Sequence, residues 1–103
     1  MALTTIMKAR CVYRKRVENE GLFVEIVIWQ LPAPTLDRPH GLKYRLHCGR
    51  GAECVVRYDN ETGKGDHRHY GSLEEIYVFK DAPSLLHDFA QDVNRLTGWR
   101  ISP

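Results

Sequence analysis

Two histidines separated by a single residue lie in a polar segment, residues 58–71, that has almost no aliphatic side chain. His67 and His69 have side chains that titrate near neutral pH, where histidine is the usual general acid and base. If the chain is extended here, side chains two positions apart project to the same side, about 6.6 Å apart along the backbone. That separation can flank a phosphate. We therefore interpret the pair as the acid and base of phosphodiester cleavage.

The same segment supplies other groups that this reaction needs. Asp66 or Asp59 is expected to orient an imidazole ring, and Lys64 or Arg45 to hold the phosphate charge. Asp66 and Lys64 complete the candidate catalytic group. The candidate substrate-binding residues are Arg45, Arg57, Tyr58, Asp59, Asn60, Arg68 and Tyr70. The alternative reading is an ordinary surface loop, with turn-forming residues and solvated histidines.

Metal ligation is a further reading of these residues. The H-x-H pair with Asp59 and Asp66 has ligand-type side chains, but only His40 or His47 could complete the set. The three cysteines lack the paired C-x-x-C spacing of a zinc site and are expected to be reduced thiols. They are Cys11, Cys48 and Cys54. We expect no metal and no cofactor.

Composition places the chain among ordinary globular proteins. It has 103 residues, 43% of them hydrophobic and 27% charged, which predicts a single domain over residues 1–103. The sequence has no run long enough to cross a membrane and no signal-peptide pattern, so a cytoplasmic protein is expected. The net charge is only +2, but basic residues gather before residue 51 and acidic ones between residues 74 and 92. This asymmetry fits either a solvated surface or a basic face that attracts a polyanion.

Alternating and apolar patterns predict about five strands. Residues 21–30 are apolar on both alternating faces, as in a central strand, and residues 11–17 precede them as a more exposed partner. Residues 42–48 and 52–59 form a predicted hairpin, and residues 74–80 form a short last strand. Three prolines between residues 31 and 41 forbid regular structure there.

The C-terminal segment, residues 82–98, predicts an amphipathic helix. Apolar residues recur at helical spacing, Ser84 is a candidate N-cap, and Gly98 stands where a C-cap belongs. The expected fold is α+β, with an antiparallel sheet of about five strands and this helix packed on one face. The predicted core is formed by Val24, Ile26, Val27, Ile28, Leu46, Val56, Leu85, Phe89 and Val93, with Leu96 ending the helical stripe.

Four sequence blocks resemble the TumE family of toxins. They are G-L-F-V-E-I-V-I-W-Q-L-P-A-P, H-G-L-K-Y-R-L, Y-D-N-E-T-G-K-G-D-H-R-H and the helix pattern L-L-x-D-F-x-x-D-V, and the likeness runs from Tyr13 to Leu96. The resemblance implies a cytoplasmic growth inhibitor, the toxin of a prokaryotic type II toxin–antitoxin module, whose partner is a helix-turn-helix antitoxin. It implies no particular reaction.

Two classes of function fit these observations. The favoured one is an endoribonuclease that cuts RNA without metal through the loop histidines. The alternative is a non-enzymatic binding module that blocks an essential cellular target by occupying it. A metal-dependent phosphodiesterase is the third possibility. The sequence predicts no oligomeric state.

Overall fold

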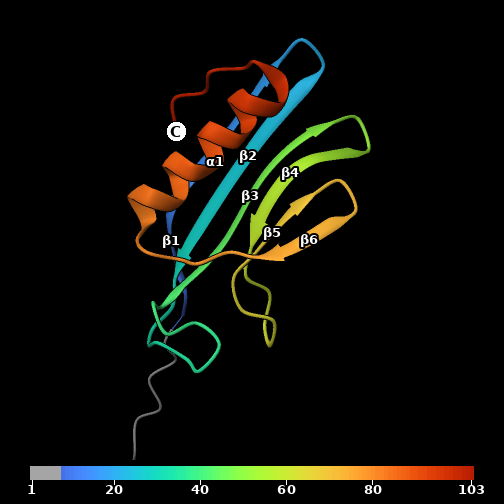
Figure 1. Cartoon of the computed structure of the whole chain (residues 1–103). Helices are drawn as coiled ribbons and strands as arrows, with labels where there is room; N and C mark the ends of the chain where they lie inside the picture. The colour runs from blue at the N-terminus through green and yellow to red at the C-terminus, as the bar shows by residue number, and fades with distance from the viewer. Residues whose placement is uncertain (1–7) are drawn as a thin grey trace, which may run out of the picture.

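The computed structural model describes residues 8–103 and arranges them as a six-stranded antiparallel sheet with one helix. The strands follow one another in chain order across the sheet, and helix α1 lies over one face (Figure 1). The elements are β1 (Arg10–Asn19), β2 (Leu22–Gln30), β3 (Leu42–Arg50), β4 (Glu53–Asp59), β5 (His67–Tyr70), β6 (Leu73–Ile76) and α1 (Ala82–Thr97). The predicted α+β class is confirmed.

Strand β5 is the element that the sequence pattern did not predict. It lies inside the polar segment, where it pairs with β4 through Arg57–Asp59 and with β6 through Leu73–Ile76. A strand without aliphatic residues gives no hydrophobic alternation. Its register comes from pairing with a well-defined neighbour instead. The predicted last strand, residues 74–80, corresponds to β6. It is shorter than predicted, because the chain leaves the sheet after Ile76.

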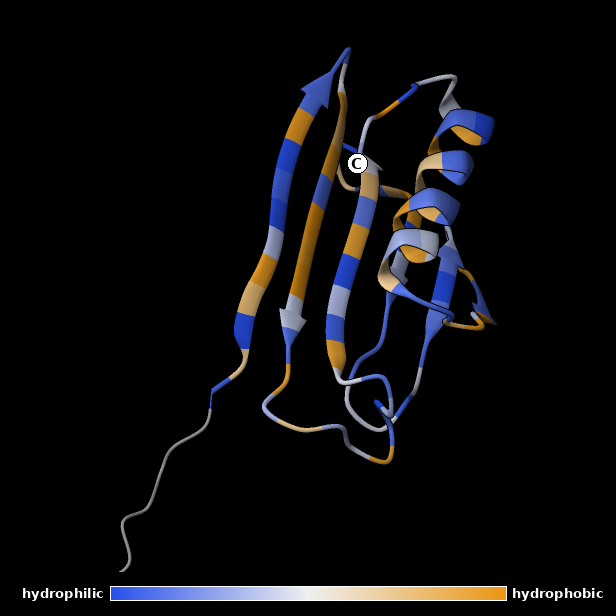
Figure 2. Cartoon of the chain, turned by 90° about the vertical axis from the view of Figure 1, so that its left-hand side faces the viewer, coloured by the Kyte–Doolittle hydropathy of each residue, from blue (hydrophilic) through white to orange (hydrophobic). Residues whose placement is uncertain are grey.

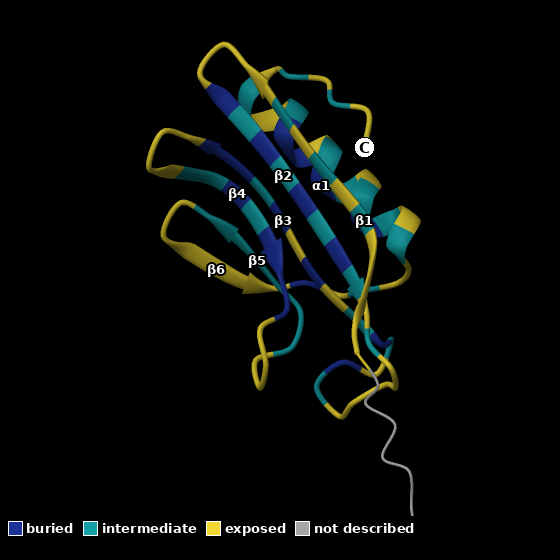
Figure 3. Cartoon of the chain, turned by 180° about the vertical axis from the view of Figure 1, so that it is seen from behind, coloured by how far each residue is buried: buried dark blue, intermediate teal, exposed yellow. Residues whose placement is uncertain are grey.

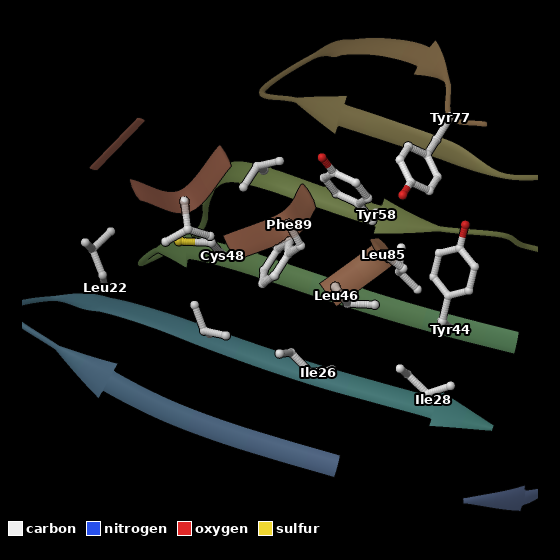
Figure 4. Packing of buried hydrophobic residues seen from close by; sticks show 13 residues of the cluster. Leu22, Ile26, Ile28, Tyr44, Leu46, Cys48, Tyr58, Tyr77, Leu85 and Phe89 are labelled. Carbon is white, nitrogen blue, oxygen red and sulfur yellow. The ribbon is translucent and has the colours of Figure 1, made fainter. Parts of the chain in front are cut away.

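The hydrophobic core fills the space between the sheet and α1. Strands β2, β3 and β4 each bury one of their two faces there, and the alternation is visible as orange and blue bands along the strands in Figure 2. Every predicted core residue except Val27 is fully or almost fully buried. Tyr44, Cys48 and Tyr58 join them, and Figure 4 shows their side chains packed among the aliphatic ones.

Val27 is a correction to the predicted core. It lies on the sheet face away from α1 and is only half-buried, because its neighbours Ile26 and Ile28 take the two positions that face the helix. An apolar run on both faces of a strand cannot reveal which face the helix covers. The face that carries Val27 is called the open face below, and Figure 3 shows it toward the viewer.

The helix ends differ in one respect from the prediction. Asp81 is the N-cap, because its carboxylate accepts a hydrogen bond of 2.7 Å from the backbone N–H of Ser84. The assignment of Ser84 as the cap is therefore wrong. Gly98 closes the helix with a φ of 78°, as predicted, whereas Leu96 is 41% exposed and lies outside the core.

Neither a disulfide nor a membrane-spanning helix is seen in residues 8–103. Cys11, Cys48 and Cys54 are free thiols, and burial raises the pKa of the Cys48 and Cys54 thiols. Both thiols therefore stay protonated. The single helix in this part of the chain is too short and polar to cross a bilayer.

Candidate functional site

His67 and His69 lie side by side on the open face of the sheet. Because β5 is extended at both positions, the two imidazoles project to the same side. Each Nε2 approaches the same oxygen of the Glu74 carboxylate on β6, at 3.9 Å from His67 and 4.0 Å from His69. The side chains keep 19% and 15% of their surface exposed. The structure thus has the geometry that the two-residue spacing predicts.

The hydrogen bonds of the two rings leave one nitrogen of each available. His67 Nδ1 lies 3.0 Å from the backbone oxygen of Gly65. A carbonyl only accepts, so Nδ1 carries the proton and Nε2 has a free lone pair. His69 Nε2 lies 3.2 Å from Asp59 Oδ1 and donates to that carboxylate, which leaves Nδ1 without a hydrogen-bond partner in residues 8–103. The two rings are therefore held in opposite tautomers.

Asp59 is the residue that positions His69. It is buried, with 6% of its surface exposed, and its second oxygen accepts a hydrogen bond of 3.0 Å from Arg57 Nε. Cross-strand pairing aligns Arg57 with His69 and Arg45 with Asp59. Arg45 is exposed on the same face. Two arginines therefore lie on the open face beside the histidines.

Asp66 is locked in a different contact network and does not orient either of these histidines. Its carboxylate accepts hydrogen bonds from Tyr44 Oη at 2.6 Å and His40 Nε2 at 3.0 Å. Burial and this carboxylate raise the pKa of Tyr44. His40 Nδ1 in turn accepts from the backbone N–H of Leu42, so neither ring nitrogen of His40 is free. The structure thus places Asp66, predicted as a catalytic residue, in contact with His40 of the proline-rich loop and Tyr44 of β3 and not with the histidine pair.

Asn60 and Lys64 also lie apart from the histidine pair. Asn60 is 1% exposed, and its amide bridges the backbone of β3 through Tyr44 N and Leu42 O. A buried amide with these partners fixes the loop and cannot contact a large substrate. Lys64 is exposed at the loop tip, with its ammonium 3.8 Å from the Glu61 carboxylate, and no contact joins it to either imidazole.

Tyr58, Arg68 and Tyr70 lie on the helix side of the sheet. Tyr58 is fully buried. Its hydroxyl and that of Tyr70 donate to Asp92 of α1, and the Arg68 guanidinium contacts the Tyr58 hydroxyl. Burial alone would raise the pKa of Asp92, but hydrogen bonds from Tyr58, Tyr70 and Arg95 lower it. These residues join β4 and β5 to the helix, so the structure places these three predicted substrate-binding residues on the opposite sheet face from the histidines.

His47, which the sequence offered only as a possible metal ligand, also lies on the open face. Its ring meets the Phe23 ring edge-on, with centroids 5.2 Å apart, and its buried Nε2 has no hydrogen-bond partner among the residues that the structure describes. Burial, and then the charges of Arg45 and Arg57, lower the pKa of His47 below its ordinary value of 6.5. His47 is therefore a neutral, partly buried ring near neutral pH.

The free energy of unfolding should fall as pH drops below about 6.5, in part because of His47. The unfolded chain binds a proton at the ordinary pKa of 6.5, whereas the folded chain binds it only at lower pH. The unfolded state therefore holds more protons in that range and is favoured. Urea titrations between pH 5 and 8 give the free energy of unfolding at each pH, and its fall toward low pH should be shallower for His47→Leu than for wild type. Above pH 7 the two plots of this free energy against pH should have the same slope. Equal slopes below pH 6.5 would contradict an origin in His47.

The candidate metal ligands do not gather into one site in residues 8–103. No group of three His, Cys, Asp or Glu side chains in this range could hold a metal ion. Asp66, one of the candidate ligands, is bonded to His40 and Tyr44 instead. The arrangement that remains is a pair of imidazoles with a buried carboxylate behind one of them.

Comparison with protein-family models identifies the class of this chain as a toxin. Residues 4–97 match the family described as Toxin TumE. The match spans nearly the whole chain, so the chain belongs to the TumE toxin family, the toxins of prokaryotic toxin–antitoxin systems, and the resemblance seen in the sequence is confirmed. A toxin of this kind has an antitoxin partner. Searches of curated proteins and of solved structures gave no match.

Proposed function

We propose that this toxin inhibits growth by cutting RNA without metal, with His67 and His69 as the base and acid. The observation that carries the proposal is the position of the two imidazoles, side by side on β5 with Glu74 Oε1 at 3.9 and 4.0 Å. The Glu74 oxygen lies 3.9 Å from His67 Nε2, the nitrogen with the free lone pair, and marks the position where the ribose 2′-hydroxyl would be expected to bind. Glu74 keeps 45% of its side-chain surface exposed, so it can swing away when substrate arrives.

The hydrogen bonds suggest which histidine has which role. His67 Nε2, with its free lone pair, takes the proton of the ribose 2′-hydroxyl, and the 2′-oxygen forms a bond to phosphorus. The bond from phosphorus to the 5′-oxygen breaks, and protonated His69 delivers a proton from Nδ1 to that oxygen. Asp59 holds His69 by its Nε2–H in the required orientation. The products are a 2′,3′-cyclic phosphate and a 5′-hydroxyl end.

The arginines of the open face supply the positive charge for this reaction. Negative charge grows on the phosphate oxygens as the 2′-oxygen attacks, and fixed cations nearby stabilise it. The Arg57 guanidinium is already bound to the Asp59 carboxylate at 3.0 Å. Arg45 lies opposite Asp59 on the neighbouring strand, and its side chain is exposed. Arg45 therefore replaces Lys64 as the favoured phosphate contact in this proposal.

Incubation of the purified chain with cellular RNA in excess EDTA tests the mechanism. We expect cleavage to proceed in the chelator, because no step uses a metal. Cleavage only after a divalent cation is restored would favour the metal-dependent phosphodiesterase. If the protein arrests growth but leaves RNA intact under both conditions, the non-enzymatic binding module is the better account.

A growth experiment tests the toxin–antitoxin pairing. We propose a type II module in the cytoplasm, in which a helix-turn-helix antitoxin binds the toxin directly and neutralises it. Expression of this chain alone should slow growth, and coexpression with the helix-turn-helix protein encoded beside it should restore growth. The double variant His67→Ala, His69→Ala serves as the matched control and should not slow growth. Normal growth of the native host without the antitoxin, during expression of the wild-type chain, would count against a toxin.

A further inference from the structure

The open face of the sheet carries an aromatic and basic surface that extends beyond the histidine site and shares only Arg45 with it. Opposite α1, strand β2 presents Phe23, Val27 and Trp29, which are all half-buried. No helix covers this side in the part of the chain that the structure describes (Figure 3). Apolar rings on an uncovered sheet face, with cations around them, are typical of an interaction surface.

Trp29 is the centre of this surface. The Arg14 guanidinium lies 5.9 Å from the centre of the Trp29 ring, and Lys43 pairs with Trp29 across β2 and β3. Arg14 and Arg45 flank Val27 from the two neighbouring strands. We call these five residues the Trp29 patch: Arg14, Val27, Trp29, Lys43 and Arg45.

The charges of the patch are not neutralised within residues 8–103. Arg14, Lys43 and Arg45 are exposed, and none of them forms an ion pair with a residue in that range. Arg16 and Arg57, on the same face, differ because their guanidinium groups bind Glu18, Glu25 and Asp59 at 2.9–3.0 Å. The patch therefore offers three free cations around one indole ring, which suits a ligand with both negative charge and flat apolar rings.

The sheet register connects the Trp29 patch directly to the histidines. Arg14, Val27, Arg45, Asp59 and His67 follow one another across five strands as cross-strand partners. Neighbouring strands lie about 4.8 Å apart, so Val27 and His67 are separated by roughly 14 Å. Arg45, which pairs with both Val27 and Asp59, lies between the patch and the site. A single extended RNA strand can therefore contact both the Trp29 patch and the histidines.

We propose that the Trp29 patch binds an unpaired stretch of the RNA that the histidines cut. Arg14, which lies over the Trp29 ring in the free protein, moves aside so that a base stacks on the ring. Arg14, Lys43 and Arg45 then bind the phosphates on either side. Bases in a duplex are already stacked within the helix and cannot lie on the indole ring, so the patch selects single-stranded RNA. This inference rests on the proposed function and adds its substrate class.

Binding is measured separately from cleavage with a 2′-O-methylated RNA, which has no 2′-hydroxyl to react. The chain has two tryptophans, so a Trp99→Phe background leaves Trp29 as the only one. We expect a short single-stranded 2′-O-methyl RNA to quench Trp29 fluorescence, and the same strand in a duplex to bind much more weakly. With fluorescently labelled RNA, Trp29→Ala should weaken binding about 5- to 150-fold, the worth of one stacked base.

A pair of lysine variants tests the charge contribution. Lys43→Gln should reduce the slope of log affinity against log salt by about 1, because one phosphate contact is lost. Lys80→Gln removes the same charge from an exposed position outside the patch and should leave the slope unchanged. Equal slopes for the two variants would overturn the phosphate contact at Lys43.

The outcomes separate this proposal from the proposed function. Equal affinity for single strand and duplex, or an unchanged affinity of Trp29→Ala, would overturn the patch even if the histidines cut RNA. Stacking on Trp29 without any cleavage of unmethylated RNA would support the patch and overturn the catalytic roles. If purified antitoxin shifts Trp29 fluorescence while RNA does not, the surface is an antitoxin site and the RNA proposal is wrong.

Discussion

His67→Ala and His69→Ala are each expected to lose RNA cleavage by about 10² to 10⁴-fold, the usual worth of general acid or base catalysis. The reason differs for the two residues. Without His67 no group with a free lone pair accepts the 2′-hydroxyl proton, and without His69 the 5′-oxygen leaves unprotonated. Initial rates of cleavage of a labelled RNA by the purified variants measure both losses.

The controls for this experiment come from the structure. His87→Ala removes an exposed helix histidine that is absent from the site and should cleave at the wild-type rate. Circular dichroism must show that the His67 and His69 variants remain folded, since their rings also bond Gly65 and Asp59. A folded variant that cleaves as fast as wild type would remove that histidine from the mechanism.

Ile26→Ala should destabilise the fold by about 2–5 kcal/mol, as expected for truncating a large aliphatic residue in a tight core. Ile26 has no exposed surface and lies on β2 beneath α1, next to Leu46 in the register (Figure 4). The lost methylene groups leave a cavity that neighbouring side chains fill only in part. Urea denaturation followed by circular dichroism gives the change.

Val27→Ala is the matched control for this prediction. It removes a smaller aliphatic side chain at the adjacent position, where the open face leaves it half-buried, so its loss should be clearly smaller. A midpoint for Ile26→Ala equal to that of wild type would mean that the helix-facing side of β2 is not the core.

Hydrophobic alternation was sufficient to predict the sheet and helix but not all of their details. Residues 42–48 alternate cleanly, and the structure buries Tyr44, Leu46 and Cys48 as that pattern requires. Strand β5 could not be found this way, because its faces carry His67 and His69 on one side and Arg68 and Tyr70 on the other. Its existence depends on hydrogen bonds to β4 and β6.

The candidate site was predictable where it depended on local geometry. The spacing of His67 and His69 is enough to place them on one side of an extended chain. The partners of Asp66 depend instead on how the proline-rich loop packs, since His40 and Tyr44 are 26 and 22 residues away in sequence. The anchor formed by Asp92 is also long-range, at 34 residues from Tyr58, and no local pattern reveals it.

The chemistry of the cut RNA ends tests the central claim most directly. Total RNA is sequenced after brief expression of the wild-type chain and of the double variant His67→Ala, His69→Ala, with libraries that distinguish 2′,3′-cyclic phosphates from 3′-hydroxyls. Attack by the 2′-hydroxyl predicts new pairs of 2′,3′-cyclic phosphate and 5′-hydroxyl ends in the wild-type sample alone. New 3′-hydroxyl and 5′-phosphate ends, or the same new ends with the double variant, would contradict cleavage by these two histidines.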